Sequence, residues 1–186
     1  MVQVLDRGTW QNPGHSNRIF SLKFVPDDPN LLISGGWDNT ILIWDLREGQ
    51  SICSLFGHMI SGDTLDFRNN VLLVGNSEIK RQLELWDFGQ RKKLRSIQWE
   101  YGSTAEKVSI YSAQFSKKSD RCILACGSIL DEARIFDQSA DCMDFGKVCG
   151  FSKSLYTVDF SPKDDMFVVA GADGEAHIVK ISHQPH

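Results

Sequence analysis

The stretch "SGGWDNTILIWD", residues 34–45, contains one dipeptide twice, first as Trp37-Asp38 and then as Trp44-Asp45. The run from Ile41 to Trp44 is apolar on successive residues, which is typical of a strand that is covered on both of its faces. Asp38 instead begins a polar turn between two apolar runs. The two dipeptides therefore have different predicted environments: Trp44 lies within a buried strand, whereas Trp37 borders a turn.

The same pattern recurs along the chain. Short alternating segments that each end in Phe span residues 19–24, 62–67, 110–115 and 155–160, and the Phe residues lie 43, 48 and 45 positions apart. Each segment is followed by a polar turn, a strand rich in small residues, a second turn and a further apolar strand. The spacer supplies a fourth strand, for example residues 51–56. Because helical periodicity is absent, the sequence predicts an all-β chain.

Composition and charge exclude several classes of function. The formal net charge is −4, and Lys and Arg are scattered, which argues against nucleic acid as a ligand. No apolar run approaches the roughly 20 residues of a membrane helix, and the N-terminus lacks the pattern of a signal peptide, so we expect no membrane partner. The expected location is the cytoplasm, with the nucleus, a cilium or the cytoskeleton as alternatives. Five cysteines without CxxC spacing predict reduced thiols and no metal site.

Two further dipeptides connect the repeats to a known family. Gly14-His15 and Gly57-His58 precede the first two units, and Trp44-Asp45 and Trp86-Asp87 end them. With a repeat length of about 43 residues, this pattern resembles the WD-repeat family of β-propellers over nearly the whole chain, most clearly from His15 to Asp45. The resemblance implies one propeller region over residues 1–186, with a C-terminal tail at 183–186 and four-stranded blades approximately at 14–56, 57–100, 101–149 and 150–182.

The number of repeats bears on how the propeller closes. WD-repeat propellers usually have about seven blades, and this chain supplies four, which implies a partial, open or shortened propeller. The alternatives are a fragment or shortened form of a larger propeller, a closed four-bladed ring, and a ring completed by another chain. Residues 1–13 are expected to form the outer strand of a neighbouring blade. An open arc would expose the apolar faces of its end blades. We nevertheless favour the shortened or partner-completed arc, because the resemblance implies repeats that are shaped for a ring wider than four blades.

The resemblance also implies a structural hydrogen-bond network. In this family a His, a Ser or Thr, an Asp and the strand Trp form a buried chain of hydrogen bonds in each blade. The first repeat matches at His15, Ser34, Asp38 and Trp44. Buried indole, hydroxyl and imidazole groups must each find a partner, so these side chains are expected to stabilise the blade rather than to catalyse a reaction.

The later repeats depart from this pattern. The second keeps His58 and Trp86 but has Gly75 at the expected hydroxyl position, which predicts an incomplete network. The third has Phe136 in place of the Trp, and the fourth retains only Asp173. The third and fourth blades are therefore expected to depend on packing.

The sequence contains no catalytic constellation. A GxSxG motif, a glycine-rich phosphate loop after a strand and a His pair at helical metal spacing are all missing, so we expect no enzyme, no cofactor and no metal. Binding is favoured instead, because a propeller offers a rigid face built from loops and strand starts. The family's top-face positions lie six and four residues before each aligned Phe, and Trp37 borders the same face. The expected partner-binding residues are Arg18, Phe20, Trp37, Ser61, Asp63, Tyr111 and Tyr156.

The residues alone imply a rigid binding platform. The resemblance to the WD-repeat family implies a non-catalytic scaffold or adaptor that binds other proteins or peptides and helps to assemble a complex. One alternative is a structural subunit of a cytoskeletal or ciliary assembly. Another is a reader of a modified peptide, either methyl-lysine held by an aromatic cage or a phosphodegron, although Arg18 is the one basic residue at the top-face positions. A purely structural alternative is also open: the aromatic side chains line the central channel, and Trp37 covers a neighbouring loop.

Overall fold

The computed structural model describes residues 3–6, 8–78, 82–99, 108–119, 121–128, 131–140 and 143–181; the predicted tail at 183–186 lies outside them. Within these residues the chain is all-β, with one 3₁₀ turn at Gln138–Ala140. The strands form four antiparallel sheets in chain order, which we call blades 1 to 4. No helix in the described part of the chain is long and apolar enough to cross a membrane.

Three of the blades have four strands each. Blade 1 contains β1 (Ile19–Val25), β2 (Asp28–Gly36), β3 (Thr40–Asp45) and β4 (Gln50–Phe56). Blade 2 contains β5 (Leu65–Arg68), β6 (Val71–Gly75), β7 (Leu83–Asp87) and β8 (Lys92–Ile97), and blade 3 contains β9 (Ile110–Phe115), β10 (Cys122–Gly127), β11 (Ala133–Asp137) and β12 (Met143–Val148). Blade 4 has three strands among the described residues, β13 (Leu155–Phe160), β14 (Met166–Gly171) and β15 (Ala176–Lys180).

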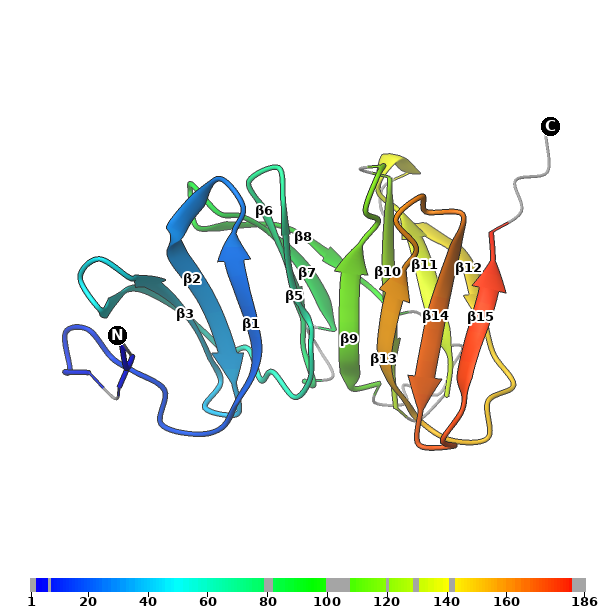
Figure 1. The fold of residues 1–186 in the computed structure, drawn as a ribbon, viewed down its shortest axis with the longest axis horizontal. Coiled ribbons are helices and arrows are strands. Elements are labelled where there is room, and N and C mark those ends of the chain that lie inside the picture. The colour runs from blue at the N-terminus through cyan, green and yellow to red at the C-terminus, as the bar shows by residue number, and fades with distance from the viewer. Residues whose placement is uncertain are drawn as a thin grey trace.

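The blades follow one another as an arc. Figure 1 shows blade 1 and blade 4 at opposite ends of the long axis, with blades 2 and 3 between them. The first strands of consecutive blades contact each other, β1 with β5, β5 with β9 and β9 with β13. The arrangement is that of an open, partial propeller.

The core lies between the blades. Each blade has a face toward the blade before it, which we call the leading face, and a face toward the blade after it, the trailing face. At the first junction Val25 and Ile33 of the trailing face of blade 1 pack with Leu65 and Phe67 of the leading face of blade 2. Equivalent clusters fill the other two junctions. Both faces of an inner blade are thus apolar, which explains the runs of successive apolar residues in the sequence.

Turn chemistry and close approach fix these blades locally. Asn39 follows Asp38 in the turn between β2 and β3 with a φ of 59°, a conformation that Asn tolerates. Gly174 occupies the equivalent turn of blade 4 with a φ of 82°. Gly62 lies so close to blade 3 that an added Cβ would come 2.0 Å from the Tyr111 carbonyl oxygen, so only glycine fits there.

The N-terminal residues lie against blade 1. The described residues 3–6 and 8–13, for which we expected an outer strand, contain no strand and one isolated bridge between Gly8 and Pro13. Gln3 Nε2 donates to the carbonyl oxygen of Leu46 at 2.8 Å, and Ser51 Oγ donates to the carbonyl oxygen of Pro13 at 2.6 Å. This segment therefore packs beside the outer part of its own first blade.

Candidate functional site

Blade 1 contains a continuous chain of hydrogen bonds, which we call its clasp. The indole N–H of Trp44 donates to Ser34 Oγ at 2.7 Å, and Ser34 Oγ lies 2.7 Å from His15 Nε2. His15 Nδ1 lies 2.8 Å from Asp38 Oδ2, so the imidazole donates to the carboxylate and accepts from the hydroxyl. The clasp ties the loop before β1 to β2, β3 and the turn between them. The four residues assigned from the family resemblance are thus brought together.

Blade 2 has a clasp built around a carboxylate. The strand register places Val74 opposite Leu65 and Glu84, which is the position of Ser34 in blade 1, so the expected hydroxyl position is Val74 rather than Gly75. Glu84 Oε2 accepts the indole N–H of Trp86 at 2.9 Å and a hydrogen bond from His58 Nε2 at 3.0 Å. Glu84 on the neighbouring strand thus replaces the missing hydroxyl for the Trp86 indole and for His58 Nε2. His58 Nδ1 is buried without a hydrogen-bond partner among the described residues, whereas His15 Nδ1 bonds Asp38 in blade 1, so the network is incomplete at that nitrogen.

Electrostatics keep this carboxylate ionised. Burial alone would raise the pKa of Glu84, whose side chain is almost fully buried. Hydrogen bonds from His58 and Trp86, together with Lys93 Nζ at 3.3 Å from Oε1, outweigh that effect and hold the pKa of Glu84 below its ordinary value. Glu84 is therefore a charged acceptor, which forms stronger hydrogen bonds than a neutral hydroxyl.

Blade 3 uses a buried ion pair. Arg134 Nε donates to Glu132 Oε1, and the same oxygen accepts the indole N–H of Trp99 at 3.0 Å. The Arg134 guanidinium lies 5.1 Å from the centre of the Trp99 ring, and that ring packs edge-on against Phe136. The expectation that blade 3 depends on packing alone is therefore wrong: Phe136 replaces the strand Trp, but an indole from outside the repeat motif enters a polar cluster of its own.

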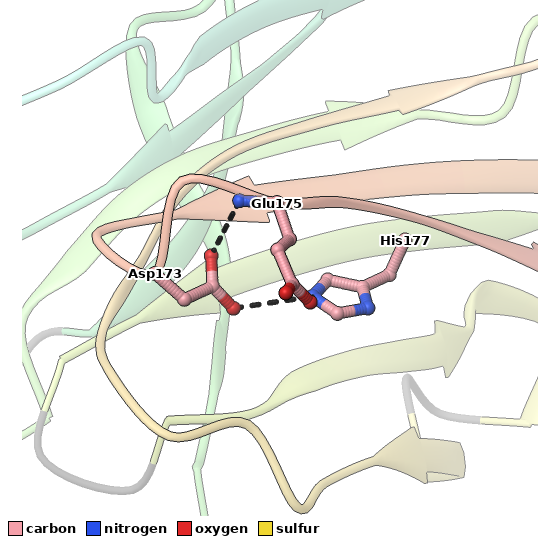
Figure 2. Close-up of side chains that lie close together, drawn as sticks. All are labelled: Asp173, Glu175 and His177. Carbon is pink, nitrogen blue, oxygen red and sulfur yellow. Dashed lines mark hydrogen bonds and ion pairs between the residues drawn. The ribbon is translucent and has the colours of Figure 1, made fainter.

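Blade 4 closes through residues of one turn and one strand, shown in Figure 2. Asp173 Oδ1 accepts the backbone N–H of Glu175 at 3.1 Å, and Asp173 Oδ2 lies 3.1 Å from His177 Nε2. The backbone bond from Glu175, followed by the bond from His177, lowers the pKa of Asp173. Asp173, Glu175 and His177 each offer one potential metal-ligand atom, and these atoms lie within 4.8 Å of one another, so the group could hold a divalent cation. Glu175 is largely exposed, however, and the hydrogen bonds of Asp173 already account for the arrangement as a clasp.

One strand position completes the clasp in the later blades. It is the residue opposite Ser34, Val74, Ala125 and Val169 on the third strand of each blade, and it is occupied by Leu42, Glu84, Arg134 and His177. The position holds Leu where the Ser hydroxyl is present and an ionisable residue in each blade that lacks the hydroxyl. Our sequence analysis missed these residues. The signal that could have found them is a charged or imidazole side chain two positions before the Trp position of an otherwise apolar strand.

An aromatic pair with a cation lies where blade 1 meets blade 2. The rings of Phe20 and Trp37 are 4.8 Å apart, and the Arg18 guanidinium lies 5.2 Å from the Trp37 ring. The indole N–H of Trp37 donates to Ser61 Oγ of blade 2 at 3.1 Å. Phe20 and Trp37 remain partly exposed. Trp37 therefore both contacts a neighbouring loop and presents a ring to solvent, which combines the two roles considered for it.

A tyrosine pair lies where blade 3 meets blade 4. The rings of Tyr111 and Tyr156 are 5.2 Å apart in an edge-on arrangement, and about half of the Tyr156 surface is exposed. Between the two pairs, Asp63 Oδ1 of blade 2 accepts the hydroxyl of Ser21 at 3.0 Å. The starts of β1, β9 and β13 lie along one edge of the molecule, the lower edge in Figure 1. We call the set Arg18, Phe20, Trp37, Tyr111 and Tyr156 the aromatic edge.

The comparisons with known proteins agree with this architecture. The family model "WD domain, G-beta repeat" matches residues 8–45. A "Guanine nucleotide-binding protein subunit beta" from Oryza sativa subsp. japonica is 28% identical over 130 residues, which cover 67% of this chain and 32% of that protein. The chain thus spans about a third of the length of this relative.

Two solved structures share the fold. A chain in the crystal structure of the Mitotic Checkpoint Complex is similar over 92% of this chain and 52% of its own length, with a TM-score of 0.76 and 18% identity. The computationally designed Ika4 protein is similar over 91% of this chain and 94% of its own length, with a TM-score of 0.71 and 22% identity. At these identities the likeness concerns the fold alone.

Proposed function

From its propeller fold and its match to the WD-repeat family model over residues 8–45, we propose that this chain is a non-catalytic adaptor that binds other proteins or peptides through the aromatic edge and helps to assemble a complex. The observation that carries this proposal is the pair of partly exposed aromatic contacts along one edge, Phe20 with Trp37 and Tyr111 with Tyr156. Aromatic side chains and Arg are the usual anchors of protein interfaces, and here the clasps hold them on rigid blades.

The geometry disfavours the two modified-peptide alternatives. A methyl-lysine cage needs an aromatic ring that is free to receive a cation, whereas the ring of Trp37 already lies 5.2 Å from the Arg18 guanidinium. A phosphodegron reader needs several basic side chains, and Arg18 is the one basic residue at the predicted top-face positions. An unmodified protein surface with an aromatic or acidic contact residue fits this edge better.

Two of the cysteines, Cys122 and Cys126 on β10, are poor candidates for a catalytic nucleophile. Burial raises the pKa of the Cys126 thiol to about 12 and raises the pKa of Cys122 as well. A nucleophilic cysteine requires the opposite shift, since the thiolate is the reactive form.

Affinity capture with this chain as bait tests the proposed function. Trp37→Ala and Tyr156→Ala each remove one ring of the aromatic edge, and both should deplete the same captured proteins, identified by mass spectrometry. Leu94→Ala is the matched control, because Leu94 is an exposed apolar side chain on β8, away from the aromatic edge. Equal capture by the wild type and the three variants would contradict the proposal. A loss of stability in the Trp37→Ala or Tyr156→Ala variant that accounts for the reduced capture would contradict it as well.

A further inference from the structure

The leading face of blade 1 exposes side chains whose counterparts are buried in every other blade. Leu22 and Phe24 are each 58% exposed. The residues at the same register positions in blades 2 to 4 are only 1% to 6% exposed because the preceding blade covers them: Leu65, Phe67, Ala113, Phe115, Val158 and Phe160. At β1, the leading face of blade 1 thus has the apolar residues of a junction between blades, but no blade covers them.

The trailing face of blade 4 shows the same difference from the opposite side. Ile178 is 71% exposed, whereas its register counterparts Ile43, Leu85 and Ile135 are 1% to 8% exposed. Val168, which pairs with Ile178, is half-buried. Among the described residues no strand pairs with the free edge of β15, whereas blades 1 to 3 each have a fourth strand. The trailing face of blade 4 is therefore uncovered at Ile178, as the leading face of blade 1 is at Leu22 and Phe24.

We propose that a second copy of this chain covers both surfaces, with the trailing face of blade 4 of one copy packed on the leading face of blade 1 of the other. The two surfaces are the two halves of an interface that the chain already builds three times, always trailing face against leading face. An exposed apolar surface of this kind marks an interaction site. A second copy is the partner that fits these two faces, because the internal junctions of the chain already pair aliphatic residues with Phe in the same way.

The geometry permits such a head-to-tail pair to close. An interface between unlike surfaces forms a ring when its rotation closes, and two copies then make two identical junctions. The four blades match 52% of a β-propeller chain at a TM-score of 0.76, so the arc has the curvature of about half of that chain. Two copies would provide eight blades, within the range of about four to eight that propellers adopt. Closure would leave neither apolar end exposed.

Light scattering on the wild-type chain measures the first consequence. The expected mass of the wild type is twice the 21.0 kDa of one chain. At the same concentration, the leading-face variant Phe24→Asp and the trailing-face variant Ile178→Lys should each have the mass of a monomer. Both side chains are exposed in the single copy, so both variants should keep the circular dichroism spectrum of the wild type. Leu94→Asp, which changes an exposed apolar residue outside the two faces, is the matched control and should remain dimeric.

Mixing the two variants distinguishes head-to-tail closure from a symmetric contact. A Phe24→Asp copy keeps its trailing face and an Ile178→Lys copy keeps its leading face, so one intact junction can form and the other places Asp against Lys. The mixture should therefore recover the dimer mass. A monomeric wild type overturns the proposal and assigns the faces to other blades or to another protein. A dimer that survives both substitutions, or a mixture that stays monomeric, overturns it as well.

Discussion

The carboxylate of Glu84 accepts the indole N–H of Trp86 at 2.9 Å on the same strand of blade 2. In blade 1 the corresponding indole of Trp44 donates to the hydroxyl of Ser34 on the neighbouring strand. The strand Trp thus keeps its buried partner although the acceptor changes in chemistry and in strand. Since an unpaired buried donor costs about 1–3 kcal/mol, this constraint accounts for a charged residue in an otherwise apolar strand.

Replacing Glu84 by Ala should destabilise the chain strongly. The substitution leaves the buried donors of His58 and Trp86 without an acceptor, and removing one partner from a buried charged network costs about 3–5 kcal/mol. Urea unfolding followed by circular dichroism measures the loss. Glu175→Ala, at an exposed carboxylate, should change the free energy of unfolding by less than about 0.5 kcal/mol. Similar losses for both variants would contradict the clasp.

Glu84→Gln should flatten part of the acid dependence of stability. The folded-state pKa of Glu84 lies below its unfolded value of about 4.5, so its contribution is fully present above that pH and is lost as pH falls through the folded pKa. The difference in unfolding free energy between wild type and Glu84→Gln should therefore shrink as the pH falls from about 6 to 3. Asp45 provides the internal reference, because its bond to Arg47 holds its pKa at about 2 and both proteins retain it. A difference independent of pH would exclude an ionised Glu84.

Substitution by Phe should destabilise the chain more at Trp44 than at Trp37. Trp44→Phe removes the donor to Ser34 inside the clasp and should cost about 1–2 kcal/mol of unfolding free energy. Trp37→Phe removes an exposed bond to Ser61 and should cost less than about 1 kcal/mol. Thermal and urea unfolding of the two variants supply the comparison. An equal or reversed order of stability would show that Trp37 belongs to the core.

Gly62→Ala should disrupt the junction between blades 2 and 3. The new Cβ would lie 2.0 Å from the carbonyl oxygen of Tyr111, and relief of such a clash requires the two backbones to separate, at a cost of about 1–3 kcal/mol. Gly146→Ala is the matched control on β12, because an added Cβ there meets no atom within 4 Å. The two unfolding midpoints should differ clearly, and coincident midpoints would mean that the junction is loosely packed.

The register of the sheets could be predicted from the sequence only in part. The alternation that ends at Phe24, Phe67, Phe115 and Phe160 marks the first strand of each blade, because a half-buried strand imposes a period of two. The assignment of Gly75 to the hydroxyl position was wrong by one residue, since the chain spacing between turns does not determine which residues face each other across a sheet.

The sequence by itself determined the local architecture: repeated short strands, the turns between them and the clasp of blade 1. These features depend on side-chain alternation, turn propensity and a motif that lies close together along the chain. Only the tertiary structure decided which atom satisfies each buried indole in blades 2 and 3, that Asp173 meets His177, and which end faces are left uncovered. Those outcomes depend on contacts between strands and between blades, and the burial that makes an unpaired donor or an exposed Phe24 costly exists only after the sheets have packed.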